Sequence, residues 1–138
     1  MIQPSEAVVL IVEDNSDNLF IASQLLRTTV KPRYINGRAS GRQLFKLIES
    51  LEDKPIHVIL QDIQIPHEDG YAILKQIRAN PRLKDTLVIA VTANVMPEDV
   101  ERAMLAGFDG FLGKPLDRNR FSGQMTRILQ GEAVWEPR

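Results

Sequence analysis

The chain has 138 residues, 43% of them hydrophobic, with a formal net charge of −1 and no cysteine. These values suit one domain with one core, and they give no basic field for nucleic acid or an anionic membrane surface. They also exclude disulfides, thiol redox chemistry and Cys-ligated zinc. The N-terminus lacks a signal-peptide pattern, and no apolar run approaches the roughly 18 residues of a membrane span. We therefore expect a soluble, cytoplasmic protein with a domain over residues 1–130 and a short tail over residues 131–138.

Short apolar runs rich in β-branched residues alternate with segments of helical spacing along the chain. Strands are expected over residues 7–12, 33–37, 58–60, 87–91 and 110–112, and helices over 17–28, 40–51, 71–79, 97–107 and 117–129. Ser16 or Asp17 is expected to cap the first helix, and Asp117 the last. Strictly alternating strands and helices imply a parallel sheet between helical layers. We predict an α/β, flavodoxin-like (βα)5 fold, a doubly wound parallel sheet of order 2-1-3-4-5 in a three-layer sandwich.

Polar side chains follow the carboxyl ends of these strands, where ligands bind in open α/β sheets. Glu13 and Asp14 follow the first strand, Asp62 the third, Thr92 the fourth and Lys114 the fifth. Three carboxylates that converge on one cleft repel one another, and a divalent cation relieves that repulsion. Because all the available ligands are oxygens, we expect Mg²⁺.

The remaining groups suit a phosphoryl ligand. Lys114 supplies a point charge for one phosphoryl oxygen, and the Thr92 hydroxyl is a donor for another. Asp62 is a candidate nucleophile that would attack phosphorus in line and form an aspartyl phosphate. Each residue alone has an ordinary structural explanation, but their joint position at successive strand ends favours phosphoryl transfer.

The chain resembles the receiver domain of response regulators in two-component systems. The motifs that carry the resemblance are LIVEDN (10–15), ILQDIQIPHEDGY (59–71), VTAN (91–94) and GFLGKPL (110–116), and it extends from about residue 7 to residue 129. It implies that Asp62 is the phosphoacceptor and that Mg²⁺ is held by Glu13, Asp14, Asp62 and the Gln64 carbonyl. It also implies that Thr92 and Phe111 form the switch, that Lys114 contacts the phosphate, and that the Lys114–Pro115 bond is cis.

By this resemblance the expected function is that of a single-domain response regulator in a phosphorelay. A histidine kinase or histidine phosphotransfer protein would donate the phosphoryl group, and a downstream protein target would read the face formed by residues 97–129. The expected enzymatic activity is limited to self-phosphorylation and self-dephosphorylation. Neither nucleic acid nor a membrane is an expected partner.

Two other functions agree less well with the sequence. A haloacid-dehalogenase-type phosphohydrolase would carry its acids after the first strand, and Gln64, two residues after Asp62, cannot be its general acid. A phosphate-independent scaffold would typically have lost Asp62, Lys114 or one of the other acids, and none is missing.

The chain departs from relatives that dimerise through this face. Gly110 stands where those receivers carry an acid, and Gln124 stands where they carry an arginine, so their salt-bridged dimer is not expected here. The face is instead expected to be polar, with Arg118 and Arg120 exposed. Trp135, in the tail, is either a docking anchor or frayed, and the sequence does not separate the two.

Overall fold

The computed structural model describes residues 1–138 and has a parallel sheet at its centre. Its strands are ordered β2-β1-β3-β6-β7-β8. Their bounds are β1 Val8–Val12, β2 Tyr34–Arg38, β3 Val58–Asp62, β6 Leu87–Thr92, β7 Gly110–Gly113 and β8 Trp135–Glu136. The five expected strands therefore lie in the predicted flavodoxin-like order, and β8 extends the sheet beyond β7.

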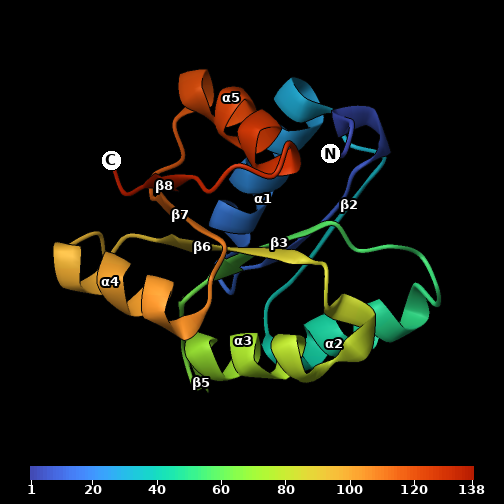
Figure 1. The fold of residues 1–138 in the computed structure, drawn as a ribbon, viewed down its shortest axis with the longest axis horizontal. Coiled ribbons are helices and arrows are strands. Elements are labelled where there is room, and N and C mark those ends of the chain that lie inside the picture. Colours follow the sequence, from blue (N-terminus) through green and yellow to red (C-terminus); the bar gives the residue numbers. More distant parts are fainter.

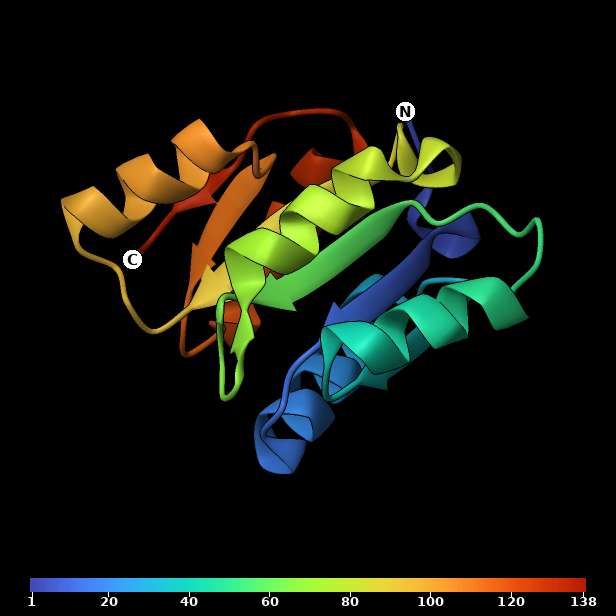
Figure 2. The same cartoon turned by 90° about the horizontal axis from the view of Figure 1, so that it is seen from below.

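Five α-helices cover the two faces of the sheet (Figure 1). They are α1 Ser16–Leu25, α2 Gly41–Ser50, α3 Gly70–Ala79, α4 Pro97–Ala106 and α5 Arg118–Leu129. Helices α1 and α5 pack on one face, and α2, α3 and α4 pack on the other, as the view from below also shows (Figure 2). None of the helices combines the length and apolar character needed to cross a membrane.

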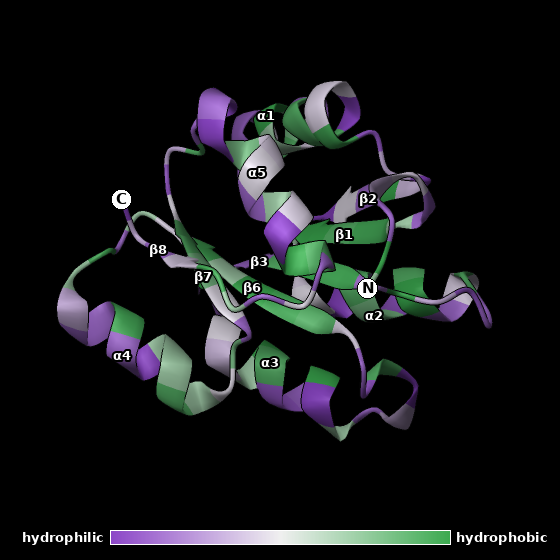
Figure 3. Ribbon diagram, turned by 45° about the horizontal axis from the view of Figure 1, so that its top comes forward, coloured by the Kyte–Doolittle hydropathy of each residue, from purple (hydrophilic) through white to green (hydrophobic).

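The core is divided by the sheet into two clusters, because successive side chains of a strand point to opposite faces. In β1, Val8, Leu10 and Val12 pack under α2 and α3, whereas Val9 and Ile11 pack under α1 and α5. The central strands are therefore apolar on both sides, and Figure 3 shows them as the most hydrophobic part of the ribbon. This burial fixes the strand ends, where the polar side chains emerge.

The helix termini agree with the predicted ones at most places. Asp117 caps α5 by accepting a hydrogen bond from the Asn119 backbone N–H at 2.8 Å, as predicted. The prediction for α1 is wrong by one residue: Asn15, and neither Ser16 nor Asp17, accepts the capping bond from Asn18 N–H at 2.9 Å. An Asn side chain caps as well as Ser or Asp, so local sequence alone did not decide the position.

Three smaller features were not predicted. After β3, β4 (Gln64–Ile65) and β5 (Glu68–Asp69) form a short antiparallel hairpin that leads into α3. A π-helical turn, η2 (Leu26–Val30), continues α1, and 3-10 turns occur at η1 (Pro4–Glu6) and η3 (Pro81–Leu83). The hairpin matters for the site because it starts two residues after Asp62.

Residues 131–138, expected as a short tail, return to the sheet instead of fraying. Trp135 and Glu136 form β8, which pairs in parallel with β7. The Trp135 ring stacks on Phe111, with ring centroids 6.4 Å apart and planes inclined by 22°. Of the two possibilities that the sequence left open for Trp135, docking is the one that the structure adopts.

Candidate functional site

Three carboxylates meet at the carboxyl ends of β1 and β3. Val12 and Gln61 are paired across the two strands, so the residues that follow them, Glu13 and Asp62, lie side by side. Oxygen atoms of Glu13, Asp14 and Asp62 all lie within 4.8 Å of one another. Glu13 and Asp62 are only 5% and 6% exposed, whereas Asp14 is exposed to solvent. The sequence prediction that these acids share one site is confirmed.

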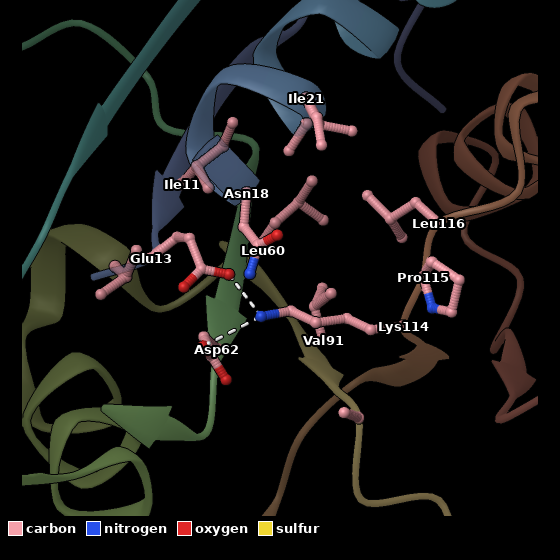
Figure 4. A pocket seen from close by; sticks show the side chains of 13 residues that line it. Ile11, Glu13, Asn18, Ile21, Leu60, Asp62, Val91, Lys114, Pro115 and Leu116 are labelled. Atoms are coloured by element: carbon pink, nitrogen blue, oxygen red, sulfur yellow. Dashed lines mark hydrogen bonds and ion pairs between the residues drawn. The ribbon is translucent and has the colours of Figure 1, made fainter. Parts of the chain in front are cut away.

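Lys114 reaches the same cluster from the end of β7. Its Nζ donates to Asp62 Oδ2 at 3.0 Å and also to Glu13 Oε1, so one ammonium bridges two carboxylates (Figure 4). Burial of the ammonium lowers the pKa of Lys114, but the bonds to Glu13 and Asp62 outweigh burial and hold the pKa above its usual value. Lys114 is therefore a fixed positive charge beside Asp62. The Lys114–Pro115 bond is cis, as the resemblance implied.

Backbone N–H groups orient both buried acids. Gln64 N–H donates to Asp62 Oδ1 at 3.0 Å, and Asn15 N–H donates to Glu13 Oε2 at 3.2 Å. Each carboxylate thus has one oxygen fixed by the loop that follows its strand and the other by Lys114. Hydrogen bonds to charged groups are strong and directional, so this arrangement holds the Asp62 carboxylate in one orientation.

The carboxylates open into a cavity of about 320 Å³. Its polar walls are Glu13, Asp62, Lys114 and Asn18, and its apolar walls come from β1, β3, β6, the first turns of α1 and the loop before α5. In the view of Figure 4, Ile21 of α1 and Leu116 both lie above the cluster of Glu13, Asp62 and Lys114. The cavity brings a charged floor and an apolar rim together at one place.

Thr92 and Gln64 lie in a neighbouring cavity of about 200 Å³, together with Asn94. Thr92 is 1% exposed, and its hydroxyl oxygen accepts a hydrogen bond from Asn94 N–H at 3.1 Å. Its carbonyl accepts from Lys114 N–H at 2.8 Å, which connects the ends of β6 and β7. Phe111 is fully buried in β7 under Trp135. The structure therefore places Glu13, Asp62 and Lys114 in one cavity and Thr92 and Gln64 in the other.

The donor set fits a hard divalent cation. Glu13, Asp14 and Asp62 carry three negative charges, and Lys114 supplies one positive charge, which leaves an excess of two negative charges. All the candidate ligands are oxygens, and Mg²⁺ keeps several waters, so a few carboxylates suffice to hold it. The part of the Gln64 carbonyl as a further ligand stays a prediction.

Three contributors to the site were not predicted from the sequence. Asn18 and Ile21 line the cavity from α1. They are three residues apart and so share a face of the helix, and this spacing could have placed both beside the end of β1. Gln61, a polar residue in the buried strand β3, donates from Nε2 to the Gly70 carbonyl at 2.6 Å. That bond joins β3 to the first turn of α3 beneath the hairpin.

A family model described as "Response regulator receiver domain" matches residues 9–125. The chain belongs to the response regulator receiver domain family. The matched range contains Glu13, Asp14, Asp62, Thr92 and Lys114. This receiver domain accordingly belongs to a two-component signalling protein.

Among curated relatives, the receiver domain is 32% identical over 126 residues to the signal transduction histidine-protein kinase BarA of Escherichia coli strain K12. The match covers 91% of this chain and 13% of BarA, so the chain spans about an eighth of that kinase.

Two solved structures are similar as well. One is the receiver domain of sensor histidine kinase PA1611 from Pseudomonas aeruginosa PAO1, at 32% identity and a TM-score of 0.70, covering 91% of this chain and 96% of that one. That structure has a magnesium ion coordinated in its active-site cleft. The other is the receiver domain of Ssk1 from Saccharomyces cerevisiae, at 26% identity and a TM-score of 0.78, covering 94% and 92%, in complex with the phosphotransfer protein Ypd1.

Proposed function

We propose that this receiver domain is a cytoplasmic phosphotransfer switch. Asp62 accepts a phosphoryl group from a histidine kinase or a histidine phosphotransfer protein, in the presence of Mg²⁺. The phosphorylated domain then changes its contacts with a downstream protein through the face formed by α4, β7 and α5. It turns over no separate substrate, and its chemistry is limited to its own phosphorylation and dephosphorylation.

The observation that carries this proposal is the position of Asp62 between Lys114 and the Gln64 backbone N–H, beside two further acids. A carboxylate oxygen of Asp62 would form the new bond to phosphorus while the nitrogen–phosphorus bond of a phosphohistidine breaks. The electron pair of that bond leaves with the imidazole. Lys114 lies where it would neutralise a phosphoryl oxygen as charge develops. Bound Mg²⁺ would supply further charge neutralisation at the same oxygens.

The rim of the cavity supports a protein as phosphoryl donor. Phe20 and Ile21 of α1 are 61% and 52% exposed, and Ile21 and Leu116 border the opening above Asp62. Exposed apolar side chains next to a reactive group suit a docking partner better than a small polar substrate. The complex of the similar Ssk1 receiver with Ypd1 supports the same class of partner.

Thr92 and Phe111 are the proposed switch. Thr92 is paired with Gly113 of β7, so a shift of Thr92 toward a phosphoryl group would also displace β7, the strand that contains Phe111. A change in the packing of Phe111 would alter the surface between α4 and α5.

The experiment is labelling with a small phosphodonor such as acetyl phosphate, with and without Mg²⁺. Wild-type protein should gain one acid-labile phosphoryl group that hydroxylamine also releases, as expected of an acyl phosphate, and Asp62→Asn should gain none. Asp53→Asn, an exposed carboxylate outside the site, is the matched control and should label as wild type. Mg²⁺-dependent labelling of Asp62→Asn at the wild-type level would refute Asp62 as the acceptor.

A further inference from the structure

The segment after α5 occupies the outer edge of the sheet. It runs back beside β7 and forms β8, with Trp135 opposite Phe111 and Glu136 opposite Leu112 (Figure 1). Phe111 N–H donates to the Val134 carbonyl at 2.8 Å, so backbone hydrogen bonding begins one residue before β8. Residues 134–138 therefore lie across the face formed by α4, β7 and α5.

Strand β7 lacks side chains where this segment approaches it. A Cβ atom added at Gly110 would lie 2.7 Å from the Val134 carbonyl oxygen, which is closer than real contacts allow. A Cβ atom added at Gly113 would collide with the Pro137 carbonyl oxygen. Glycine at both ends of β7 thus permits an extended backbone to lie close against the strand.

Helix α5 presents a set of donors to the same segment. Arg120 donates to Glu136 at 2.7 Å, Gln124 donates at 2.9 Å, and Arg127 donates to the other carboxylate oxygen. The three donors lie one or two helical turns apart and so share a face of α5. Arg120 and Arg127 keep 43% and 41% side-chain exposure, so they remain reachable from solvent.

Together these features hold an extended segment of chain between the β7 edge and α5. We propose that the β7 edge and this face of α5 form a docking site for an extended acidic peptide segment of a partner protein, and that residues 134–138 occupy the site as an intramolecular competitor. The partner segment carries an aromatic residue followed by an acid, and it adds to β7 in parallel, as β8 does. Backbone pairing supplies the binding, and the aromatic and acidic side chains supply the selectivity.

Charge and size argue for displacement by such a partner. Two guanidinium groups bind the single carboxylate of Glu136, so these contacts favour a segment that carries an acid at this position. Strand β8 contains only two residues, and an element with so few backbone hydrogen bonds opens more readily than the core. A longer partner strand with the same pattern would replace it. Peptide docking at β7 and α5 does not depend on phosphorylation of Asp62, so failure of either proposal leaves the other unaffected.

The test uses the full chain and a fluorescein-labelled peptide of sequence AVFEPQ, which keeps the aromatic–acid pair, has no basic residue and adds no tryptophan. In wild-type protein the site is filled, and the peptide should bind weakly by fluorescence anisotropy. Glu136→Gln removes the anchor of the intramolecular segment, and the peptide should bind this variant at least tenfold more tightly. Acrylamide quenching of Trp135, the single tryptophan, should rise several-fold in the same variant.

Controls distinguish the docking site from a general loss of structure. Adding Arg127→Gln to Glu136→Gln should abolish peptide binding, whereas adding Arg118→Gln, an exposed arginine of α5 outside the cluster, should not. Far-ultraviolet circular dichroism should stay unchanged in all variants. If Glu136→Gln alone leaves Trp135 shielded, Trp135→Ala with Glu136→Gln opens the docking site for the same anisotropy measurement.

Equal peptide affinity for wild-type protein, for Glu136→Gln and for Trp135→Ala with Glu136→Gln would overturn the proposal. So would binding that survives Arg127→Gln. A concentration-dependent dimer of wild-type protein, dispersed by the peptide, would mean that a second copy of this chain and not a different partner is the occupant. Sedimentation velocity separates that outcome from a monomer that binds the peptide.

Discussion

The protein has two clusters of carboxylates and cations, and they differ in which charge is in excess. At the ends of β1 and β3, Glu13, Asp14 and Asp62 share the single ammonium of Lys114. On the outer side of α5, the single carboxylate of Glu136 is shared by two guanidinium groups and an amide. The two clusters use the same chemical groups in opposite proportions.

That difference separates a site that needs a ligand from one that supplies its own. The first cluster keeps an excess of negative charge at a place where two of its acids are buried, so it attracts a divalent cation. The second cluster is an anchor, because Glu136 already has three donors and its pKa is held at about 2, chiefly by the bonds from Gln124 and Arg127. Four predictions test this contrast, in order of expected effect.

The largest effect is expected from removing the one positive charge of the acidic cluster. Lys114→Met leaves Glu13 and Asp62 buried without a counter-charge, and breaking such a pair lowers the free energy of unfolding by about 3 kcal/mol or less, since Lys114 retains some exposure. Added Mg²⁺ should recover part of this loss, because the ion neutralises the same acids. Urea denaturation with and without millimolar Mg²⁺ measures the loss of stability and its recovery by the metal.

Lys84→Met is the control for Lys114→Met. Lys84 is exposed and precedes β6, so it lies at the amino end of the strands, away from the acids, and its replacement should change stability by less than about 0.5 kcal/mol. A loss in Lys114→Met that Mg²⁺ does not reduce would mean that lysine and metal neutralise different groups. The excess of negative charge on the acidic cluster would then not be what attracts the metal.

The second effect concerns the metal itself. In wild-type protein a Mg²⁺ concentration one hundredfold above Kd should stabilise the fold by about 2.7 kcal/mol. Glu13→Gln with Asp14→Asn removes two of the three acids, so this stabilisation should largely disappear, while metal-free stability should rise or stay level because repulsion is relieved. Thermal melts across a Mg²⁺ titration give the comparison.

Glu49→Gln, an exposed acid of α2, is the matched control for the metal prediction and should keep the full Mg²⁺-dependent shift in Tm. An undiminished shift in the Glu13 and Asp14 double variant would place the ion at another site.

The acidic cluster was predictable from sequence, and the α5 cluster was not. Buried parallel strands are recognisable as apolar runs, and a residue that ends such a run lies at the ligand-binding edge of the sheet. Glu13, Asp62 and Lys114 could therefore be grouped without knowing a single distance. Their charge then pointed to a metal, which agrees with the geometry observed.

Docking of residues 134–138 depends on contacts with residues that are distant in the sequence, and no short sequence pattern predicts such contacts. Glu136 is held by side chains 9 to 16 residues away, and Trp135 by Phe111 across the sheet. A two-residue strand has too short a pattern to be read from alternation. Gly110 and Gln124 were noted in the sequence as departures, and their contacts with Val134 and Glu136 give both a physical reason.

The third prediction follows from the lowered pKa of Glu136. Because the folded-state pKa is about 2 and the ordinary value is 4.5, the carboxylate stabilises the docked segment above pH 4.5 and loses this contribution as the pH falls toward 2. Acrylamide quenching of Trp135 should therefore rise as the pH is lowered through this window. In Glu136→Gln, quenching should already be high and should not change over the same range.

Circular dichroism recorded alongside the quenching separates release of the segment from acid unfolding of the domain. A wild-type quenching transition that coincides at every pH with loss of helical signal would show that Glu136 does not control the segment.

The smallest effect is expected at Gln124, the one uncharged member of the α5 cluster. Gln124 is 5% exposed and gives one hydrogen bond to Glu136, so Gln124→Leu should lower the free energy of unfolding by about 1 kcal/mol while both arginines keep the segment docked. Gln124→Glu has nearly the same size but places a second carboxylate against Glu136, and it should release the segment. Hydrogen exchange at the β7 amides and Trp135 quenching should thus move little in the first variant and strongly in the second. If both variants behave alike, packing and not charge holds the segment to α5.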